Sequence, residues 1–155
     1  MTLRFEYLAD RPEDVPEVIN WWYTVWADRM DGSIDSLVAR LRSSLSSKSL
    51  PVNIVATLDG RMVGTAALKA HEMQDVFPGL RYWLGSVYVA PEYRGNGIAT
   101  AMTSRIVELA GERNLPQLHL QTENIDGGLY ARLGWEPLER VVYKGTDTLL
   151  MVKTL

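Results

Sequence analysis

The chain has 155 residues, a length that predicts one domain, residues 1–155, with about two-thirds of its unfolded surface buried in a single core. Its formal net charge of −3 argues against a nucleic-acid partner, which would require a basic stripe on the surface. The sequence contains no cysteine, which excludes disulfides and a covalent thiol mechanism.

The two histidines, His71 and His119, stand alone in the sequence. A zinc site would have to combine them with carboxylates, and because ordinary surface or core histidines are expected instead, we predict no metal. The N-terminal stretch lacks a basic start followed by an apolar run, and no segment reaches the length of a membrane span. We therefore expect a cytoplasmic protein without a membrane partner.

The N-terminal part predicts a strand and two helices. Residues 3–7 alternate apolar and polar side chains, the period of a strand with one buried face. Asp14 is the expected cap of the first helix, and Glu17 completes a pattern similar to a capping box. Ser33 begins the second helix, and residues 43–49 end it as a polar loop. Apolar residues at helical spacing predict the buried faces: Val15, Ile19, Trp22, Trp26 and Met30 in the first helix, and Ile34, Leu37, Leu41 and Leu45 in the second.

A hairpin and the central strand follow. Residues 51–58 and 62–70 predict two strands joined by an Asp59-Gly60 turn. The loop 71–80 is too mixed in composition for an assignment. Residues 82–89 then form an apolar, β-branched and aromatic strand. Gly85, alone inside this strand, marks either a bulge or a simple packing position.

The segment after this strand carries the strongest chemical signal. The strand stops at Pro91, gives way to the sequence Arg94-Gly95-Asn96-Gly97, and turns at once into a helical pattern. The first turn of a helix presents backbone N–H groups without intrahelical partners and the positive end of the helix dipole. Gly95 and Gly97 remove the Cβ atoms that would keep an oxygen-rich ligand from these amides, and Arg94 adds a positive charge. We therefore expect a phosphate or pyrophosphate here.

Other interpretations of the same segment are possible. The glycines alone are compatible with a plain turn between a strand and a helix. A dinucleotide-binding fingerprint fails because Thr100 occupies the third glycine position, and a Walker loop fails because no Gly-Lys-Ser/Thr follows.

The C-terminal part completes the predicted sheet. The helix after the glycine segment has an apolar stripe of Ile98, Met102, Ile106 and Leu109. A turn at 114–116 leads to a strand at 118–122, and a helix from about 126 to 133 ends at Gly134. Residues 135–143 and 148–152 predict a final antiparallel hairpin around 144–147.

Two motifs resemble a known family. Arg94, Gly97 and Ala99 fit the pattern Gln/Arg-x-x-Gly-x-Gly/Ala, and the sequences TEN and GLYARLGW follow in the matching order. Both are similar to the GNAT superfamily of N-acetyltransferases, strongly from Val52 to the C-terminus and loosely before it. The resemblance implies an α/β (α+β) GNAT fold, a mixed and mostly antiparallel central sheet of about seven strands with four helices. The implied order is strand, helix, helix, three strands, helix, strand, helix and two strands.

The resemblance also implies a coenzyme site. Acetyl-coenzyme A would pair its pantetheine arm with the end of the fourth strand and place its pyrophosphate at the glycine segment. The expected binding residues are Val87, Tyr88, Val89, Arg94, Gly95, Asn96, Gly97, Ile98, Ala99, Thr100, Asn124 and Tyr130.

Tyr130 falls where the family has a catalytic tyrosine. A tyrosine has a pKa of about 10 and a thiol about 8.5, so the hydroxyl can hydrogen-bond the departing sulfur and deliver a proton to it. The alternative is an ordinary helix tyrosine packed near Leu133 and Trp135. The segment from Asn124 to Tyr130 is one residue shorter than its counterpart in the family.

The general base stays open. Members of the family often carry a glutamate on the fourth strand, and residues 82–89 contain none. The candidates are Glu72, Asp75, Glu123, His119 or a water route for the proton.

These motifs predict an enzyme that transfers the acetyl group of acetyl-coenzyme A to a primary amine of a small molecule by direct attack in a ternary complex. The alternatives are a non-catalytic acyl-coenzyme A sensor or regulatory module, and an acetyltransferase of protein N-termini or lysines. In the family the first helix walls the acceptor site, so Trp21 and Tyr23 belong either to that wall or to the core. The final hairpin is a possible homodimer interface.

Overall fold

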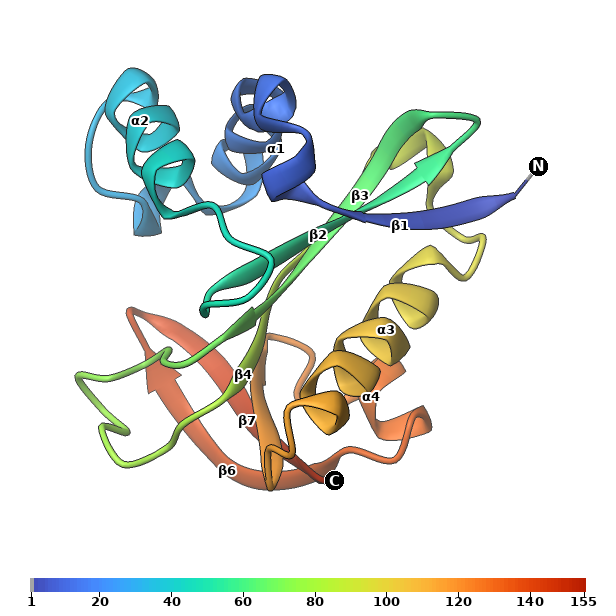
Figure 1. The fold of residues 1–155 in the computed structure, drawn as a ribbon. Helices are drawn as coiled ribbons and strands as arrows, with labels where there is room; N and C mark the ends of the chain where they lie inside the picture. Colours follow the sequence, from blue (N-terminus) through green and yellow to red (C-terminus); the bar gives the residue numbers. More distant parts are fainter. Residues whose placement is uncertain (1) are drawn as a thin grey trace. The chain divides into compact units, whose positions relative to one another are not determined.

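The computed structural model describes residues 2–155, and in this part of the chain seven strands and four helices follow the predicted order (Figure 1). The hydrogen-bonded order of the sheet is β1-β2-β3-β4-β5-β7-β6, with β4 and β5 parallel and the pairs β1–β2, β5–β7 and β6–β7 antiparallel. The predicted fold class is confirmed. The strands are β1 (Leu3–Tyr7), β2 (Val52–Leu58), β3 (Arg61–Lys69), β4 (Trp83–Val89), β5 (Gln117–Thr122), β6 (Glu136–Tyr143) and β7 (Thr146–Thr154), and the helices are α1 (Val15–Trp26), α2 (Ile34–Ser44), α3 (Ile98–Glu112) and α4 (Gly128–Arg132).

The chain divides into two compact units. The first comprises the chain up to Ala67 together with Ser86–Met102, and the second comprises Leu68–Gly85 and Thr103–Leu155. The prediction of one domain stays a prediction. None of the helices in the described chain combines the length and the apolarity that crossing a membrane requires.

In the first unit, α1 and α2 lie side by side (Figure 1). β1 pairs with β2 from Leu3↔Leu58 to Tyr7↔Ile54, and the Asp59-Gly60 turn has the two left-handed residues of a tight hairpin. Apolar burial between the helices and the strands forms the core of the unit. Its buried members are Leu8, Val15, Val18, Ile19, Leu37, Val55 and Met62.

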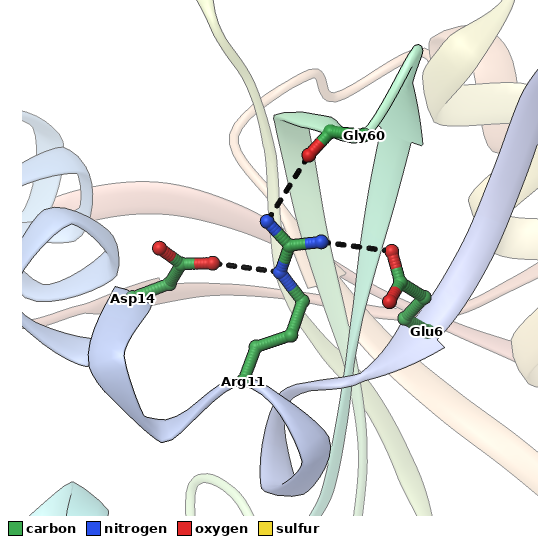
Figure 2. A network of polar contacts seen from close by, with 4 residues as sticks. All are labelled: Glu6, Arg11, Asp14 and Gly60. Atoms are coloured by element: carbon green, nitrogen blue, oxygen red, sulfur yellow. Dashed lines mark hydrogen bonds and ion pairs between the residues drawn. The ribbon is translucent and has the colours of Figure 1, made fainter.

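A half-buried network around Arg11 joins three elements of this unit (Figure 2). Arg11 donates from Nε to Asp14 at 2.6 Å, from Nη1 to Glu6 in β1 at 2.9 Å, and from Nη2 to the Gly60 carbonyl of the β2–β3 turn at 3.2 Å. The hydrogen bond to Asp14 is the largest of the effects that raise the pKa of Arg11. Because the Asp14 carboxylate accepts from Arg11 and makes no cap hydrogen bond, the predicted capping box is wrong.

Of the other predictions for the first two helices, some are confirmed and some are wrong. Ser33 caps α2 as predicted, since its hydroxyl accepts a hydrogen bond from the Ser36 amide. Ile34 is exposed, so the predicted stripe of α2 is wrong at its first position. Met30 lies beyond the end of α1. Val18, which the predicted stripe omitted, is fully buried.

In the second unit, β7 lies between β5 and β6. In the β5–β7 pair, Gln117 lies opposite Thr154, and β6 forms the outer edge of the sheet. A core of Met73, Trp83, Tyr143 and Leu150 fills this unit. The final hairpin turns at Lys144-Gly145, both left-handed, so the predicted loop of residues 144–147 is two residues too long.

The last helix is shorter than predicted. α4 begins at Gly128 rather than Asp126, because the preceding Gly127 has a φ of +85°, which an α-helix does not accommodate. It ends as expected at left-handed Gly134, whose amide donates to the Ala131 carbonyl.

Candidate functional site

The loop between β4 and α3 brings together the predicted phosphate-binding residues. Arg94 is exposed, and its Nε donates to the Val89 carbonyl at 2.9 Å. Its guanidinium carbon lies 5.6 Å from the ring centroid of Tyr88, which is buried. Arg94 has five N–H donors, and within residues 2–155 only Nε has a recorded partner, so the others are available to an anion.

Two glycines shape the turn at the start of α3. Gly95 and Gly97 have φ values of +81° and +76°, in the left-handed region that favours glycine. In the described chain the amides of residues 95–100 have no recorded hydrogen-bond partner, while the Ala101 amide donates to the Gly97 carbonyl and closes the first turn. A loop that combines such amides with a guanidinium has the kinds of donor that a pyrophosphate requires.

Asn96 has a role inside the loop. Its Nδ2 donates to the carbonyls of Tyr93 at 2.9 Å and Arg94 at 3.2 Å, so the side chain stabilises the turn. Ile98 is buried and anchors the first turn of α3, while Ala99 and Thr100 are half-buried. The segment Val87–Val89 lies in the same unit.

Trp21 of α1 contacts this part of β4 directly, and Trp22 is linked to it through Thr65 of β3. Trp21 stacks on Tyr88 with ring centroids 5.3 Å apart and an angle of 26° between the rings. Trp22 Nε1 donates to Thr65 Oγ1 at 3.0 Å, and Thr65 Oγ1 donates to the Ser86 carbonyl at 2.8 Å. In the sequence, the one indication of these contacts is that Trp21 lies outside the predicted apolar stripe of the first helix while the adjacent Trp22 lies in it.

Tyr130 and Asn124 lie in the second unit. The Tyr130 ring makes an edge contact with Trp135 at 6.2 Å, and within residues 2–155 its hydroxyl has no recorded hydrogen-bond partner. Burial raises the pKa of Tyr130. The hydroxyl therefore stays protonated at neutral pH, the state that a proton donor needs. Asn124 is exposed and accepts a backbone hydrogen bond from Gly127 at 2.9 Å.

All four candidate residues for the base also lie in the second unit, and each of them has an interaction partner. Glu72 accepts a hydrogen bond from Gln121 at 2.6 Å and forms an ion pair with Lys69 at 3.5 Å. Asp75 accepts from the Tyr143 hydroxyl at 3.0 Å. His119 is buried, with Nδ1 3.0 Å from the Arg81 carbonyl. Glu123 is exposed.

The position of the Glu72 side chain explains why residue 85 is a glycine. A Cβ on Gly85 would lie 2.0 Å from Glu72 Oε2, so the missing side chain admits this carboxylate. The left-handed residue of β4 is the neighbouring Ser86, with φ +53°. The Glu72 contact supports the packing interpretation of Gly85, and the left-handed Ser86 beside it is compatible with the bulge interpretation.

Among residues 2–155, no group of three or more His, Asp or Glu side chains lies close enough to hold a metal ion.

The chain matches the family model of the acetyltransferase (GNAT) domain over residues 52–137, more than half of its length. An N-acetyltransferase from Staphylococcus aureus Mu50 has a similar structure, with a TM-score of 0.77 and 14% identity over 99% of each chain. A ribosomal-protein-alanine N-acetyltransferase from Brucella melitensis gives 0.74 and 22% over 100% of each chain. An aminoglycoside 6'-N-acetyltransferase complexed with coenzyme A gives 0.74 and 13%, covering 99% of this chain and 97% of the other.

These similarities agree with the seven-stranded sheet. The match to the family model shows that the chain belongs to the GNAT family and is an acetyl-coenzyme A-dependent N-acetyltransferase.

Proposed function

We propose that this enzyme acetylates a primary amine of a small molecule by direct attack in a ternary complex. The observation that carries the proposal is the loop before α3, where the amides of residues 95–100 have no hydrogen-bond partner within residues 2–155 and Arg94 adds a guanidinium to the same loop. These donors would bind the pyrophosphate of acetyl-coenzyme A, and Val87–Val89 and Asn124 would contact the rest of the coenzyme. The coenzyme supplies an acetyl group on a thioester, which a neutral amine can attack directly.

Tyr130 is the proposed general acid. When the amine attacks the thioester carbonyl, a carbon–nitrogen bond forms, the nitrogen gives up a proton to a base or to water, and the carbon–sulfur bond breaks. The sulfur leaves as a thiolate that needs a proton or a hydrogen bond. A phenol whose pKa burial raises keeps its proton at neutral pH and can donate it.

The Tyr130→Phe variant tests this role. It removes the proton donor and keeps the ring, so we expect kcat to fall about 10- to 100-fold while the dissociation constant of coenzyme A stays within about twofold. Tyr7→Phe in β1 is the matched control and should keep wild-type kcat. Wild-type kcat in Tyr130→Phe at pH 7 would show that Tyr130 is not the acid.

The acceptor class is inferred from two kinds of relatives. Similar structures include aminoglycoside 6'-acetyltransferases, which by name act on a small molecule with amino groups. The similar ribosomal-protein-alanine N-acetyltransferase acts by name on a protein, and this supports protein N-termini as the second candidate. The mildly acidic net charge is compatible with a cationic amine.

A thiol-release assay distinguishes the two classes. The protein is incubated with acetyl-coenzyme A and, separately, with aminoglycosides, polyamines, amino acids and peptides with free N-termini. The proposal expects thiol release with at least one small amine at a kcat/KM above that of any peptide. Faster turnover of a peptide would favour the protein substrate, and tight coenzyme binding without release over any amine would contradict the proposal.

We also propose that two copies associate through the β6 edge. Leu138 and Val142 on this strand are 51% and 76% exposed, and an edge strand has unpaired backbone groups. Light scattering should give a dimer mass for the wild type and a monomer mass for Val142→Lys. A monomeric wild type at high micromolar concentration would contradict this association.

A further inference from the structure

Trp21 and Trp22, two consecutive residues of α1, stabilise the two ends of one short segment of β4, Ser86–Val89. At its end, Trp21 stacks on Tyr88, and Tyr88 in turn lies under the Arg94 guanidinium. Arg94 completes this contact by donating to the Val89 carbonyl at 2.9 Å. The three side chains therefore form a continuous series of ring and cation contacts from α1 to the loop before α3.

The start of the segment has a separate brace. Trp22 donates to Thr65, which is 1% exposed, and Thr65 donates to the carbonyl of Ser86. Ser86 has a left-handed backbone at φ +53°, a conformation that a non-glycine residue adopts only when neighbouring groups hold it.

The contact of Trp21 can affect the free energy of binding because it orders the Tyr88 ring and, through that ring, the Arg94 side chain. An exposed arginine has many rotamers, and fixing one of them costs conformational entropy when a ligand binds. A guanidinium that already lies on an aromatic ring has fewer rotamers, so it loses less conformational entropy when the ligand binds. The Tyr88 ring can serve as this platform only if it is itself held, and Trp21 stacks directly on it.

We propose that Trp21 is a positioning residue for the coenzyme diphosphate, acting through Tyr88 on Arg94. The proposal rests on the proposed binding of coenzyme A at the loop before α3. It assigns Trp21 a function that neither a core tryptophan nor a wall of the acceptor site would have. α1 thereby contributes to coenzyme affinity without a residue of its own on the coenzyme.

A double-mutant cycle tests the proposal. Trp21→Leu keeps apolar volume toward the core and removes the aromatic face, and Arg94→Ala removes the cation. By calorimetry, Trp21→Leu alone should weaken coenzyme A binding about three- to tenfold, the range of one ring or cation contact. In the Arg94→Ala background the same substitution should change the dissociation constant less than about 1.5-fold, because its only route is already lost.

Two further measurements separate positioning from general structural support. Trp21→Phe keeps a ring on Tyr88 and should restore affinity to within about twofold of the wild type. Trp21→Leu should also make coenzyme affinity less dependent on salt concentration, because the guanidinium contact with the diphosphate is the screened one. Val25→Ala, at a 50% exposed position of the same helix, is the control and should bind as the wild type does.

Two results would overturn this role. An equal loss of affinity from Trp21→Leu with and without Arg94 would mean that Trp21 acts by general packing, and an unchanged affinity would mean that it does not act at all. Both differ from failure of the proposed function, in which the wild-type protein itself would not bind coenzyme A.

Discussion

Gly85 in β4 has no Cβ, and the carboxylate of Glu72 takes the space beside it. This carboxylate comes from the loop after β3, accepts from Gln121 and forms an ion pair with Lys69. β4 has no acidic residue of its own, so Glu72 brings a negative charge to a strand whose sequence lacks one. A single missing side chain thus determines where a buried carboxylate lies.

Gly85→Ala should therefore displace Glu72. The new Cβ would lie 2.0 Å from Oε2 and 3.1 Å from the Lys69 side chain, so the carboxylate must move and lose its hydrogen bond from Gln121. We expect the free energy of unfolding to fall by about 1–2 kcal/mol in urea titrations. Gly79→Ala, whose Cβ meets no atom within 4 Å, is the control and should change it by less than about 0.5 kcal/mol. Equal effects of the two variants would contradict the contact.

The burial of Tyr130 makes the free energy of unfolding depend on pH. Because burial raises the pKa of Tyr130, the folded protein holds this proton at pH values where the unfolded chain has lost it. The contribution to stability is complete below the unfolded pKa of about 10 and is lost as pH rises through the higher folded pKa. Above pH 10 the free energy of unfolding of the wild type should fall more steeply than that of Tyr130→Phe. Parallel curves would contradict the raised pKa.

At the scale of elements, β3 and β4 approach closely at Gly64. A Cβ on Gly64 would lie 2.7 Å from the Tyr88 carbonyl oxygen and 3.0 Å from Met102. Because the first of these atoms belongs to the backbone, the strand itself would have to move. Tyr88 carries the ring that supports Arg94, so packing between strands is coupled to the proposed coenzyme site.

Gly64→Ala and Gly111→Ala should consequently have opposite effects. Gly64→Ala should lower the free energy of unfolding by about 1–3 kcal/mol and also weaken coenzyme A binding. Gly111 lies in α3 with open space around it, so alanine there should raise the free energy of unfolding by up to about 1 kcal/mol. Urea titrations of both variants measure the two changes. A loss of stability in Gly111→Ala would show that helix propensity does not decide this position.

At the scale of the whole molecule, a ligand that binds only the folded state stabilises it by mass action. Coenzyme A at 100 times its dissociation constant should add about 2.7 kcal/mol and raise Tm by about 5–10 °C. Arg94→Ala removes a charge-assisted contact, and with about tenfold weaker binding the same concentration should give about half of this stabilisation. A melting scan of both proteins measures the shifts, with pantetheine, which lacks the diphosphate, as the control ligand. No shift in the wild type would contradict coenzyme binding, and an equal shift in Arg94→Ala would contradict the role of the arginine.

Predictions from the sequence succeeded where short-range preferences decide. The Asp59-Gly60 turn, the Ser33 cap and the stop at Gly134 each depend on a few adjacent residues, and all three are confirmed. The prediction for Asp14 failed because Arg11, three positions earlier, binds the carboxylate, and Arg11 is itself held by Glu6 and by the distant Gly60 carbonyl. The site residues Tyr130 and Asn124 keep their proposed roles as predictions.

The order of strands and helices and the arginine–glycine loop before α3 follow from the sequence alone, because periodicity and glycine backbone preferences act over a few residues. Only the tertiary structure decided which distant groups meet. Trp22 and Thr65 are 43 positions apart and Gln121 and Glu72 are 49 apart, and no local pattern encodes such pairs. Their contacts arise because strands and helices bury their apolar faces together, and that packing selects the polar partners.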